Sequence, residues 1–139
     1  KSIVKNKSII LIDDSLVRGT TCNKIVKMLY ESGAKEVHVR IACPEIKYPD
    51  FYGVDMPTKE ELLAHKKNIR EMCNHIGAKS LEFLSLAGLY TALKGEKRNS
   101  NYPQFSDHYF TGDYPIIPHD NLANIRSKQL SLLSGKSNN

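Results

Sequence analysis

The first part of the chain alternates apolar and polar segments in the order of a strand, a helix and a second strand. Residues 9–12 are apolar at every position, which is typical of a central parallel strand covered on both faces. Residues 13–19 are predicted to form a loop, and a helix follows from about residue 20 to Gly33. Residues 37–41 then alternate apolar and polar positions, which predicts a second strand. Together these segments predict a βαβ unit with a right-handed crossover.

The middle of the chain predicts shorter elements. Residues 45–57 are rich in Tyr, Pro and Gly and are predicted to form a long loop. Thr58 and Glu61 have the spacing of a capping box, which predicts a short helix after them. A helix over 68–76 is expected next. Residues 81–85 predict a third short strand, and residues 86–93 predict a further helix. The helical residues expected to face the core are Ile25, Met28, Leu29, Ile69, Met72, Cys73 and Ile76.

The fold class that these elements predict is α/β with a parallel sheet. We expect residues 1–94 to form this α/β domain, which is incomplete at its N-terminal side. From residue 95 the sequence becomes polar, with Gly, Ser, Asn and Pro spread through it. Residues 95–139 are therefore expected to form a polar linker, an extended arm and one weak amphipathic helix around residues 122–133.

Composition changes this picture only slightly. The chain has 139 residues, of which 40% are hydrophobic and 25% charged, the range of an ordinary globular domain. No apolar run approaches the length of a membrane span, and no signal peptide opens the sequence, so we expect no membrane partner. The first residue is Lys1 rather than Met, so we expect that something was removed upstream or that the chain is a piece of a longer polypeptide.

The net charge and the cysteines indicate which partners and which cellular compartment to expect. Twenty Lys and Arg against fifteen Asp and Glu give a net charge of +5. The basic residues are scattered, however, and form no recognisable nucleic-acid-binding motif. We therefore expect no nucleic acid partner, and a polyanionic small molecule explains the charge equally well. The three cysteines form no close pair, which favours a reducing, cytoplasmic location over a disulfide framework.

The most informative segment is residues 13–21, Asp-Asp-Ser-Leu-Val-Arg-Gly-Thr-Thr. Ligands of open α/β sheets bind beyond the carboxyl ends of the strands, where the two acids lie. Gly19 permits a tight turn, and the start of the next helix offers backbone N–H groups that suit a phosphate. Carboxylates beside a phosphate are consistent if they bind sugar hydroxyls or Mg²⁺. The alternative without a ligand is a capped βα turn with solvated acids.

This segment resembles the phosphoribosyl pyrophosphate (PRPP) motif of type I phosphoribosyltransferases. Residues 42–57, 76–81 and 110–115 resemble one family among them, the glutamine-dependent amidophosphoribosyltransferases of purine synthesis. The similarity extends from residue 1 to about residue 115, and it implies that residues 1–94 are the C-terminal part of a phosphoribosyltransferase-type, Rossmann-like domain. It implies that the substrate is PRPP, with Mg²⁺ as cofactor, and that purine nucleotides inhibit.

The resemblance also implies roles for individual residues. Asp13 and Asp14 would bind the ribose hydroxyls and share the Mg²⁺ ion, and residues 17–21 would hold the 5-phosphate. No catalytic residue is assigned. The residues expected at the PRPP site are Asp13, Asp14, Ser15, Val17, Arg18, Gly19, Thr20 and Thr21. A nucleotide or sugar-phosphate loop is expected to contain Tyr48, Tyr52, Asp55 and Pro57, and a rigid loop that merely packs is the alternative.

Family members make phosphoribosylamine from PRPP and ammonia that a separate N-terminal domain releases from glutamine. That domain and the upstream part of the phosphoribosyltransferase domain are expected partners of this chain, so we expect negligible turnover from the 139 residues alone. Some members carry an iron–sulfur cluster bound through a Cys-x-x-Cys, but residues 106–109 here read Ser-Asp-His-Tyr, so no cluster is expected and His108 is predicted to be an exposed loop residue. The unpaired edge of the strand at 9–12 predicts a homo-oligomer.

Two other functions use the same residues. The first is a non-catalytic, PRPP-sensing regulatory module, which would combine the motif with a nucleic-acid-binding part. The sequence shows no helix-turn-helix pattern that would indicate such a part. A response-regulator receiver would use the acidic pair for Mg²⁺ and Asp55 as phosphoacceptor. The residues before Asp55 are not an apolar strand, and no Lys-Pro follows a later strand, so the receiver is the weaker interpretation.

Overall fold

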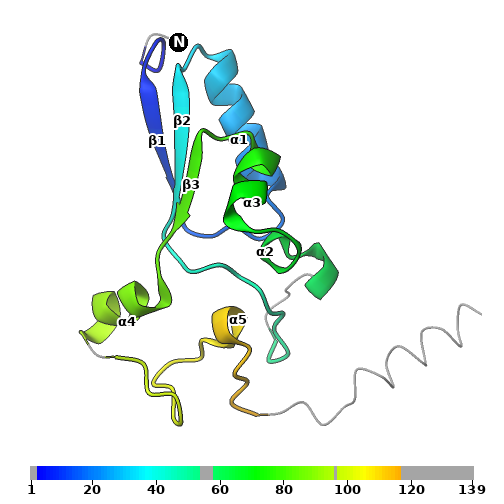
Figure 1. Cartoon of the computed structure of the whole chain (residues 1–139), viewed down its shortest axis with the longest axis vertical. Helices are drawn as coiled ribbons and strands as arrows, with labels where there is room; N and C mark the ends of the chain where they lie inside the picture. Colours follow the sequence, from blue (N-terminus) through cyan, green and yellow to red (C-terminus); the bar gives the residue numbers. More distant parts are fainter. Residues whose placement is uncertain (1–2, 54–57, 96, 117–139) are drawn as a thin grey trace, which may run out of the picture.

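The computed structural model describes residues 3–53, 58–95 and 97–116 of the chain, which form an α/β fold (Figure 1). The strands are β1 Ser8–Asp13, β2 Glu36–Ile41 and β3 Ser80–Phe83. The helices are α1 Thr20–Glu31, the 3₁₀ turn η1 Lys59–Glu61, α2 Leu63–Lys66, α3 Ile69–Ile76, α4 Leu86–Lys94 and α5 His108–Thr111.

The three strands form one parallel sheet in the order β1-β2-β3. Ile9 lies opposite Val37, and Val39 lies opposite both Leu11 and Leu81. This arrangement confirms the predicted βαβ unit and the α/β class. It also argues against a receiver, because receivers have the strand order 2-1-3-4-5, in which the first strand lies between the second and the third.

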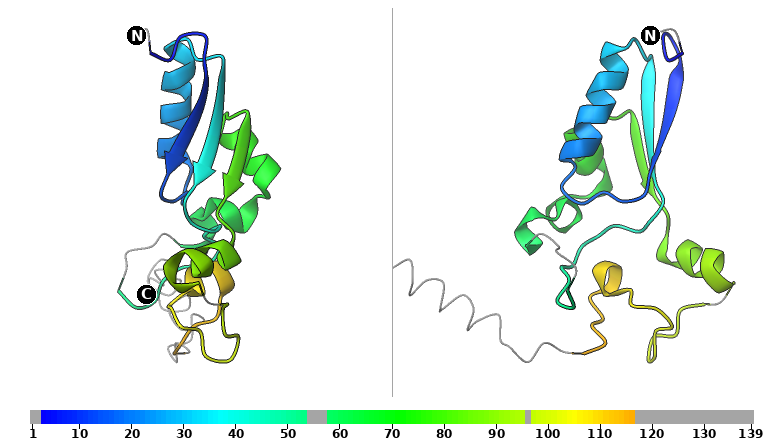
Figure 2. Two further views of the ribbon diagram at one scale, coloured as in Figure 1. Left: turned by 90° about the vertical axis from the view of Figure 1, so that its left-hand side faces the viewer. Right: turned by 180° about the vertical axis from the view of Figure 1, so that it is seen from behind.

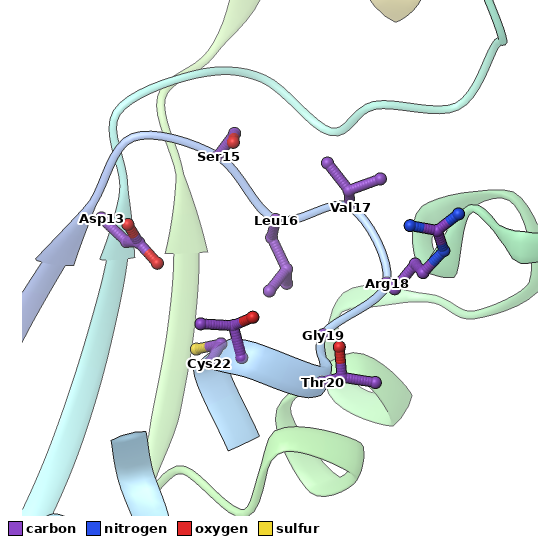
Figure 3. A pocket seen from close by; sticks show the side chains of 9 residues that line it. Asp13, Ser15, Leu16, Val17, Arg18, Gly19, Thr20 and Cys22 are labelled. Atoms are coloured by element: carbon purple, nitrogen blue, oxygen red, sulfur yellow. The ribbon is translucent and has the colours of Figure 1, made fainter. Parts of the chain in front are cut away.

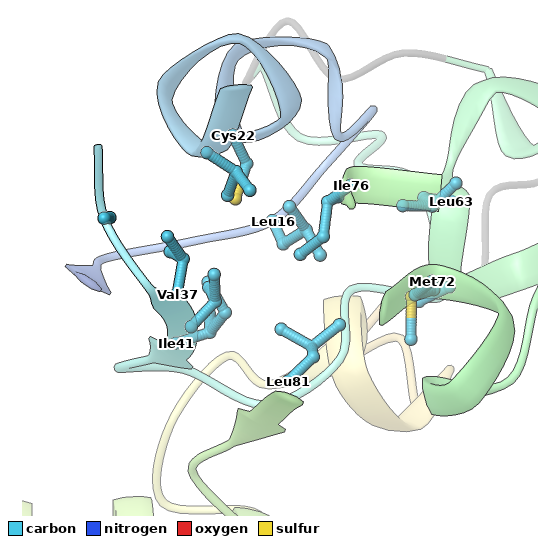
Figure 4. Close-up of a cluster of buried hydrophobic side chains, with 12 residues drawn as sticks. Leu16, Cys22, Val37, Ile41, Leu63, Met72, Ile76 and Leu81 are labelled. Carbon is cyan, nitrogen blue, oxygen red and sulfur yellow. The ribbon is translucent and has the colours of Figure 1, made fainter. Parts of the chain in front are cut away.

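Helices α1 and α3 cover one face of this sheet, as two views turned by 90° and 180° show (Figure 2). The core lies between these helices and the inward residues of β2, and Val37 and Val39 have no exposed surface (Figure 4). Alternation along β2 causes this burial, because every second side chain of a strand points to the same face. The cluster of buried residues consists of Leu16, Cys22, Val26, Ala34, Val37, Val39, Ile41, Leu63, Ala64, Met72, Ile76 and Leu81.

The prediction that β1 is covered on both faces is wrong for the described residues. Ile9 and Leu11 pack against the core, whereas Ile10 is 66% exposed and Ile12 73% exposed on the other face. The reason is positional, since β1 lies at the edge of the described sheet and α1 and α3 lie on one side of it. Ile10 and Ile12 therefore form an exposed apolar strip on β1. The outer edge of β1 has no neighbouring strand within the described sheet.

The helical faces were predicted correctly only in part. Met72 and Ile76 of α3 are fully buried, but Ile69 is 42% exposed at the first turn. In α1 the buried residues are Cys22 and Val26 rather than Met28, which is 56% exposed. Residues four positions apart share a helix face, so the face centred on Cys22 and Val26 turns Met28 toward the outside.

The predicted helix ends are confirmed by their caps. Asn68 accepts a hydrogen bond from the Glu71 amide at 2.9 Å and begins α3, and Gly77 ends it in the left-handed conformation. The Glu61 carboxylate accepts from the Thr58 amide at 3.2 Å, as a capping box requires. Ser85 caps α4 instead of continuing β3.

Residues 97–116 contain a buried ionic cluster that the sequence did not predict. Arg98 pairs with Asp107, and Tyr90 of α4 donates to the same carboxylate at 2.8 Å. His108 is buried rather than exposed, which corrects the prediction, because its Nε2 lies 2.8 Å from Asp50 Oδ1. The predicted helix around residues 122–133 lies outside the described residues.

Candidate functional site

A hollow of about 290 Å³ lies at the carboxyl end of β1, where the chain turns into α1 (Figure 3). We call it the β1–α1 pocket. Ligands of open α/β sheets bind at this end of the strands. All the residues expected at the PRPP site line the pocket except Asp14, which lies in the chain between the lining residues Asp13 and Ser15. The lining residues are Asp13, Ser15, Leu16, Val17, Arg18, Gly19, Thr20, Thr21 and Cys22.

The pocket loop is held by contacts at both ends and in its middle. The Asp13 carbonyl accepts a hydrogen bond from the Ala42 amide at 2.8 Å, next to the end of β2. Leu16 is 2% exposed and belongs to the core cluster, so it anchors the loop by burial. The Val17 carbonyl accepts from the Leu63 amide at 2.9 Å, which ties the loop to α2.

Gly19 sets the geometry of the turn into α1. It has φ 79° and ψ −8°, a left-handed conformation that favours glycine. A Cβ at this position would lie 2.9 Å from Leu63 Cδ2 and 3.2 Å from His75 Cδ2. Glycine is therefore required here both for the backbone conformation and for the close packing of the turn.

The start of α1 presents backbone donors to the pocket. The helix has twelve residues, its N-cap Gly19 supplies no capping side chain, and its first turn contains no acid. The Asn23 amide is the first to bond within the helix, to the Gly19 carbonyl at 2.9 Å. The first N–H groups of a helix have no acceptor within the helix and attract anions. The amides of Thr20, Thr21 and Cys22 are therefore the candidate donors to an anion in the pocket.

The negative charge at this end of β1 comes from Asp13, which lines the pocket, and from Asp14, the next residue in the chain, which does not. The Asp14 amide donates to Asp13 Oδ1 at 3.1 Å, and the Ser15 hydroxyl donates to Asp14 Oδ1 at 3.1 Å. Within the described residues no group of three or more His, Cys, Asp or Glu side chains could hold a metal ion. Two carboxylates are nevertheless the usual protein contribution to Mg²⁺, which takes its other ligands from water and substrate phosphates. The donor set thus fits Mg²⁺ that arrives with a phosphorylated ligand.

The cysteines near the acids are not activated thiols. Burial, and then the charge of Asp13, raise the pKa of Cys22 to about 11. Burial and the charge of Asp14 likewise raise the pKa of Cys43 to about 11. Both thiols are protonated at neutral pH, and neither is a candidate nucleophile.

Arg18 is the cationic residue of the pocket lining. Its Nη2 donates to Glu61 Oε2 at 3.4 Å, and both side chains are about half exposed. The hydrogen bond from Arg18 lowers the pKa of Glu61. Sequence reasoning did not find this pair, because 43 positions separate the two residues.

The expected nucleotide loop lies apart from the pocket lining. Tyr52 meets the His108 ring edge-on at a centroid distance of 5.1 Å, and its hydroxyl donates to the Ile116 carbonyl at 2.6 Å. The Tyr48 ring packs closely against Gly112. The described part of this loop is therefore packed against residues 108–116. The other two residues expected there, Asp55 and Pro57, lie outside the described residues.

Another hollow, of about 310 Å³, is lined by residues at the carboxyl ends of the three strands. Its lining includes Ile12, Arg40 and Phe83. Arg40 Nε lies 3.4 Å from a Glu82 carboxylate oxygen. Because its cation is paired and much of the remaining lining is apolar, this hollow is a poorer candidate for an anion than the β1–α1 pocket.

The parallel sheet, the acidic pair after its first strand and the Gly-Thr-Thr helix start define a phosphoribosyltransferase-type α/β domain. No protein-family model matches the chain. The amidophosphoribosyltransferase of Rhizobium etli is 50% identical over 135 residues, which are 96% of this chain and 27% of that protein. The amidophosphoribosyltransferase of Staphylococcus epidermidis is 48% identical over 131 residues, 94% of this chain and 26% of that protein.

Solved structures agree with these relatives. Glutamine PRPP amidotransferase from B. subtilis, complexed with ADP and GMP, matches with a TM-score of 0.77 and 43% identity over 86% of this chain and 26% of that chain. A structure described as the allosteric regulatory enzyme of purine biosynthesis matches with a TM-score of 0.73 and 44% identity over 86% of this chain and 25% of that one. Over the segment that it spans, about a quarter of the length of these relatives, the chain belongs to the amidophosphoribosyltransferase family.

Proposed function

We propose that the chain supplies the PRPP- and Mg²⁺-binding part of an amidophosphoribosyltransferase. The whole enzyme would make 5-phosphoribosylamine from PRPP and glutamine-derived ammonia, in the first step of de novo purine biosynthesis. The observation that carries this proposal is the β1–α1 pocket, which is lined by Asp13 and by an uncapped helix start, with Asp14 following Asp13 in the chain. Sequence identity near 50% to amidophosphoribosyltransferases supports the choice of reaction.

The 5-phosphate would bind at the start of α1. Backbone N–H groups of residues 19–21 and the hydroxyls of Thr20 and Thr21 would donate to its oxygens, and the helix dipole favours the negative charge. Gly19 itself lines the pocket, and its left-handed backbone conformation makes the turn from the loop into this helix start. Ser15 and Val17 would line the path between phosphate and sugar.

The ribose would bind beside the acids. Carboxylates accept hydrogen bonds from vicinal hydroxyls, so Asp13 and Asp14 would orient the sugar and hold C1 toward the part of the site that other residues of the whole enzyme complete. The same carboxylates would contact Mg²⁺, which when bound neutralises the pyrophosphate of PRPP. No described residue is assigned as general acid or base.

Purine nucleotides are proposed as ligands of the same site. The B. subtilis relative is complexed with ADP and GMP. A nucleoside 5′-phosphate presents the same ribose phosphate that PRPP presents, so it would compete for the start of α1. Tyr48, Tyr52, Asp55 and Pro57 remain the proposed nucleotide loop, which precedes η1 in the chain.

The whole enzyme is proposed to act in the cytoplasm, as a homo-oligomer, with its glutaminase domain and the rest of its phosphoribosyltransferase domain as partners of this segment. No helix among the described residues is long and apolar enough to cross a membrane. The exposed strip of Ile10 and Ile12 beside the β1 edge is a surface that those partners would cover.

Calorimetric titration of the chain with PRPP, with and without Mg²⁺, tests the proposal. We expect saturable, Mg²⁺-dependent binding that is lost in the double variant Asp13→Asn, Asp14→Asn. Glu31→Gln is the matched control, because Glu31 is an exposed acid at the far end of α1. Absence of binding, or equal binding by the double variant, would refute the proposal. Pyrophosphate release is expected to be negligible, and turnover by the 139 residues alone would show that the site is more complete than we propose.

A further inference from the structure

The guanidinium of Arg18 is bonded outside the pocket that its backbone helps to form. Arg18 lines the β1–α1 pocket, yet its Nη2 donates to Glu61 Oε2 on η1 at 3.4 Å. Figure 3 shows the Arg18 side chain turned away from Leu16 and Asp13. The positive charge of the pocket is therefore directed toward a carboxylate of the protein rather than toward the space that a ligand would occupy.

This ion pair is weak enough to be exchanged. Its distance is longer than that of a good charge-assisted hydrogen bond, and the side chains of Arg18 and Glu61 are 52% and 48% exposed. Exposed pairs of this kind contribute little to stability because water and salt screen them. A phosphate ester offers Arg18 more negative charge and several acceptor oxygens, and Arg can bind such a group through two parallel hydrogen bonds.

Glu61 itself is fixed by a second contact. The oxygen that accepts from Arg18 also accepts from the Thr58 amide at 3.2 Å, which caps η1. A glutamate carboxylate is ionised at neutral pH even without a cationic partner, because the ordinary pKa of a glutamate lies well below 7. Glu61 therefore remains in place with its charge when Arg18 moves, as a competitor for Arg18 must.

We propose that Glu61 competes with a bound phosphate ester for Arg18 and thereby limits the affinity of the β1–α1 pocket. Binding of the phosphate would exchange the Arg18–Glu61 pair for an Arg18–phosphate pair. Glu61 is then a positioning residue that acts through Arg18. The inference deepens the proposed function and rests on it only in assuming that the pocket takes a sugar phosphate.

The test is a calorimetric titration of the full chain with ribose 5-phosphate, without Mg²⁺, at neutral pH and low salt. Glu61→Gln removes the charge, but Gln still serves the capping box with Thr58. We expect this variant to bind more tightly by up to about fivefold, the range of an exposed ion pair. Glu60→Gln is the matched control, because it removes the same charge from the adjacent position of η1, and we expect less than half of the effect.

A double-mutant cycle shows whether Glu61 acts through Arg18. Arg18→Gln should weaken binding, and adding Glu61→Gln to that variant should leave its affinity unchanged. Unchanged or weaker binding by Glu61→Gln would overturn the proposal, as would equal gains from Glu60→Gln or a gain that persists without Arg18. Absence of ribose 5-phosphate binding by both the unaltered chain and Glu61→Gln would instead refute the proposed function.

Discussion

Replacing Gly19 by alanine tests how the turn into α1 is built. The residue has φ 79°, and a Cβ there would lie 2.9 Å from Leu63 Cδ2. A left-handed conformation costs a non-glycine residue about 1–2 kcal/mol. Leu63 is only 7% exposed, so its side chain cannot move away freely, and inserting a methyl group into such packing costs about 1–3 kcal/mol. Gly19→Ala should therefore lower the free energy of unfolding by about 2–5 kcal/mol.

Gly77→Ala is the matched control for this substitution. Gly77 has φ 75°, but a Cβ there would meet nothing within 4 Å. Gly77→Ala should therefore cost about 1–2 kcal/mol for the left-handed backbone conformation, with no added cost from a close contact. Urea unfolding followed by circular dichroism measures both variants, and ribose 5-phosphate binding should weaken in Gly19→Ala while it persists in Gly77→Ala. If Gly19→Ala is no less stable than Gly77→Ala, the close packing of Gly19 against Leu63 does not constrain the turn.

Further predictions concern other parts of the chain. Because their pKa values are about 11, Cys22 and Cys43 should react slowly with iodoacetamide at pH 7 and faster as the pH rises toward 11, and rapid labelling at pH 7 would contradict their protonated state. His108→Ala leaves the buried Asp50 carboxylate without its imidazole partner and should cost about 3 kcal/mol in urea unfolding, whereas Asp50→Asn should cost less. The chain should self-associate through the open edge of β1, and Ile12→Lys should reduce this association. Sedimentation velocity measures it, and a monomer at high concentration would contradict the edge prediction.

Local sequence patterns predicted the elements that carry the site. The strand at 9–12, the loop after it and the helix from residue 20 follow from short-range periodicity and from Gly19, and these features form the β1–α1 pocket. The capping box at Thr58 and the start of a helix at residue 68 were equally local signals.

The features that were missed depend on contacts between distant residues. His108 is buried because Asp50, 58 positions earlier, pairs with it, and no local pattern at residues 106–109 indicates that partner. The exposure of Ile12 was missed for a related reason. An apolar strand predicts that both faces are covered, but which elements cover them is decided by the packing of the whole sheet. Arg18 and Glu61 are likewise adjacent only in the folded chain.

The central claim is that the start of α1 holds a phosphate group. The most direct test is a titration of the ¹⁵N-labelled chain with ribose 5-phosphate, monitored through backbone amide chemical shifts. The account predicts the largest shift changes at the amides of Gly19, Thr20 and Thr21, with saturation at one ligand per chain. Unchanged amides at these positions, or changes centred on Ile12 and Arg40 in the other hollow, would contradict it.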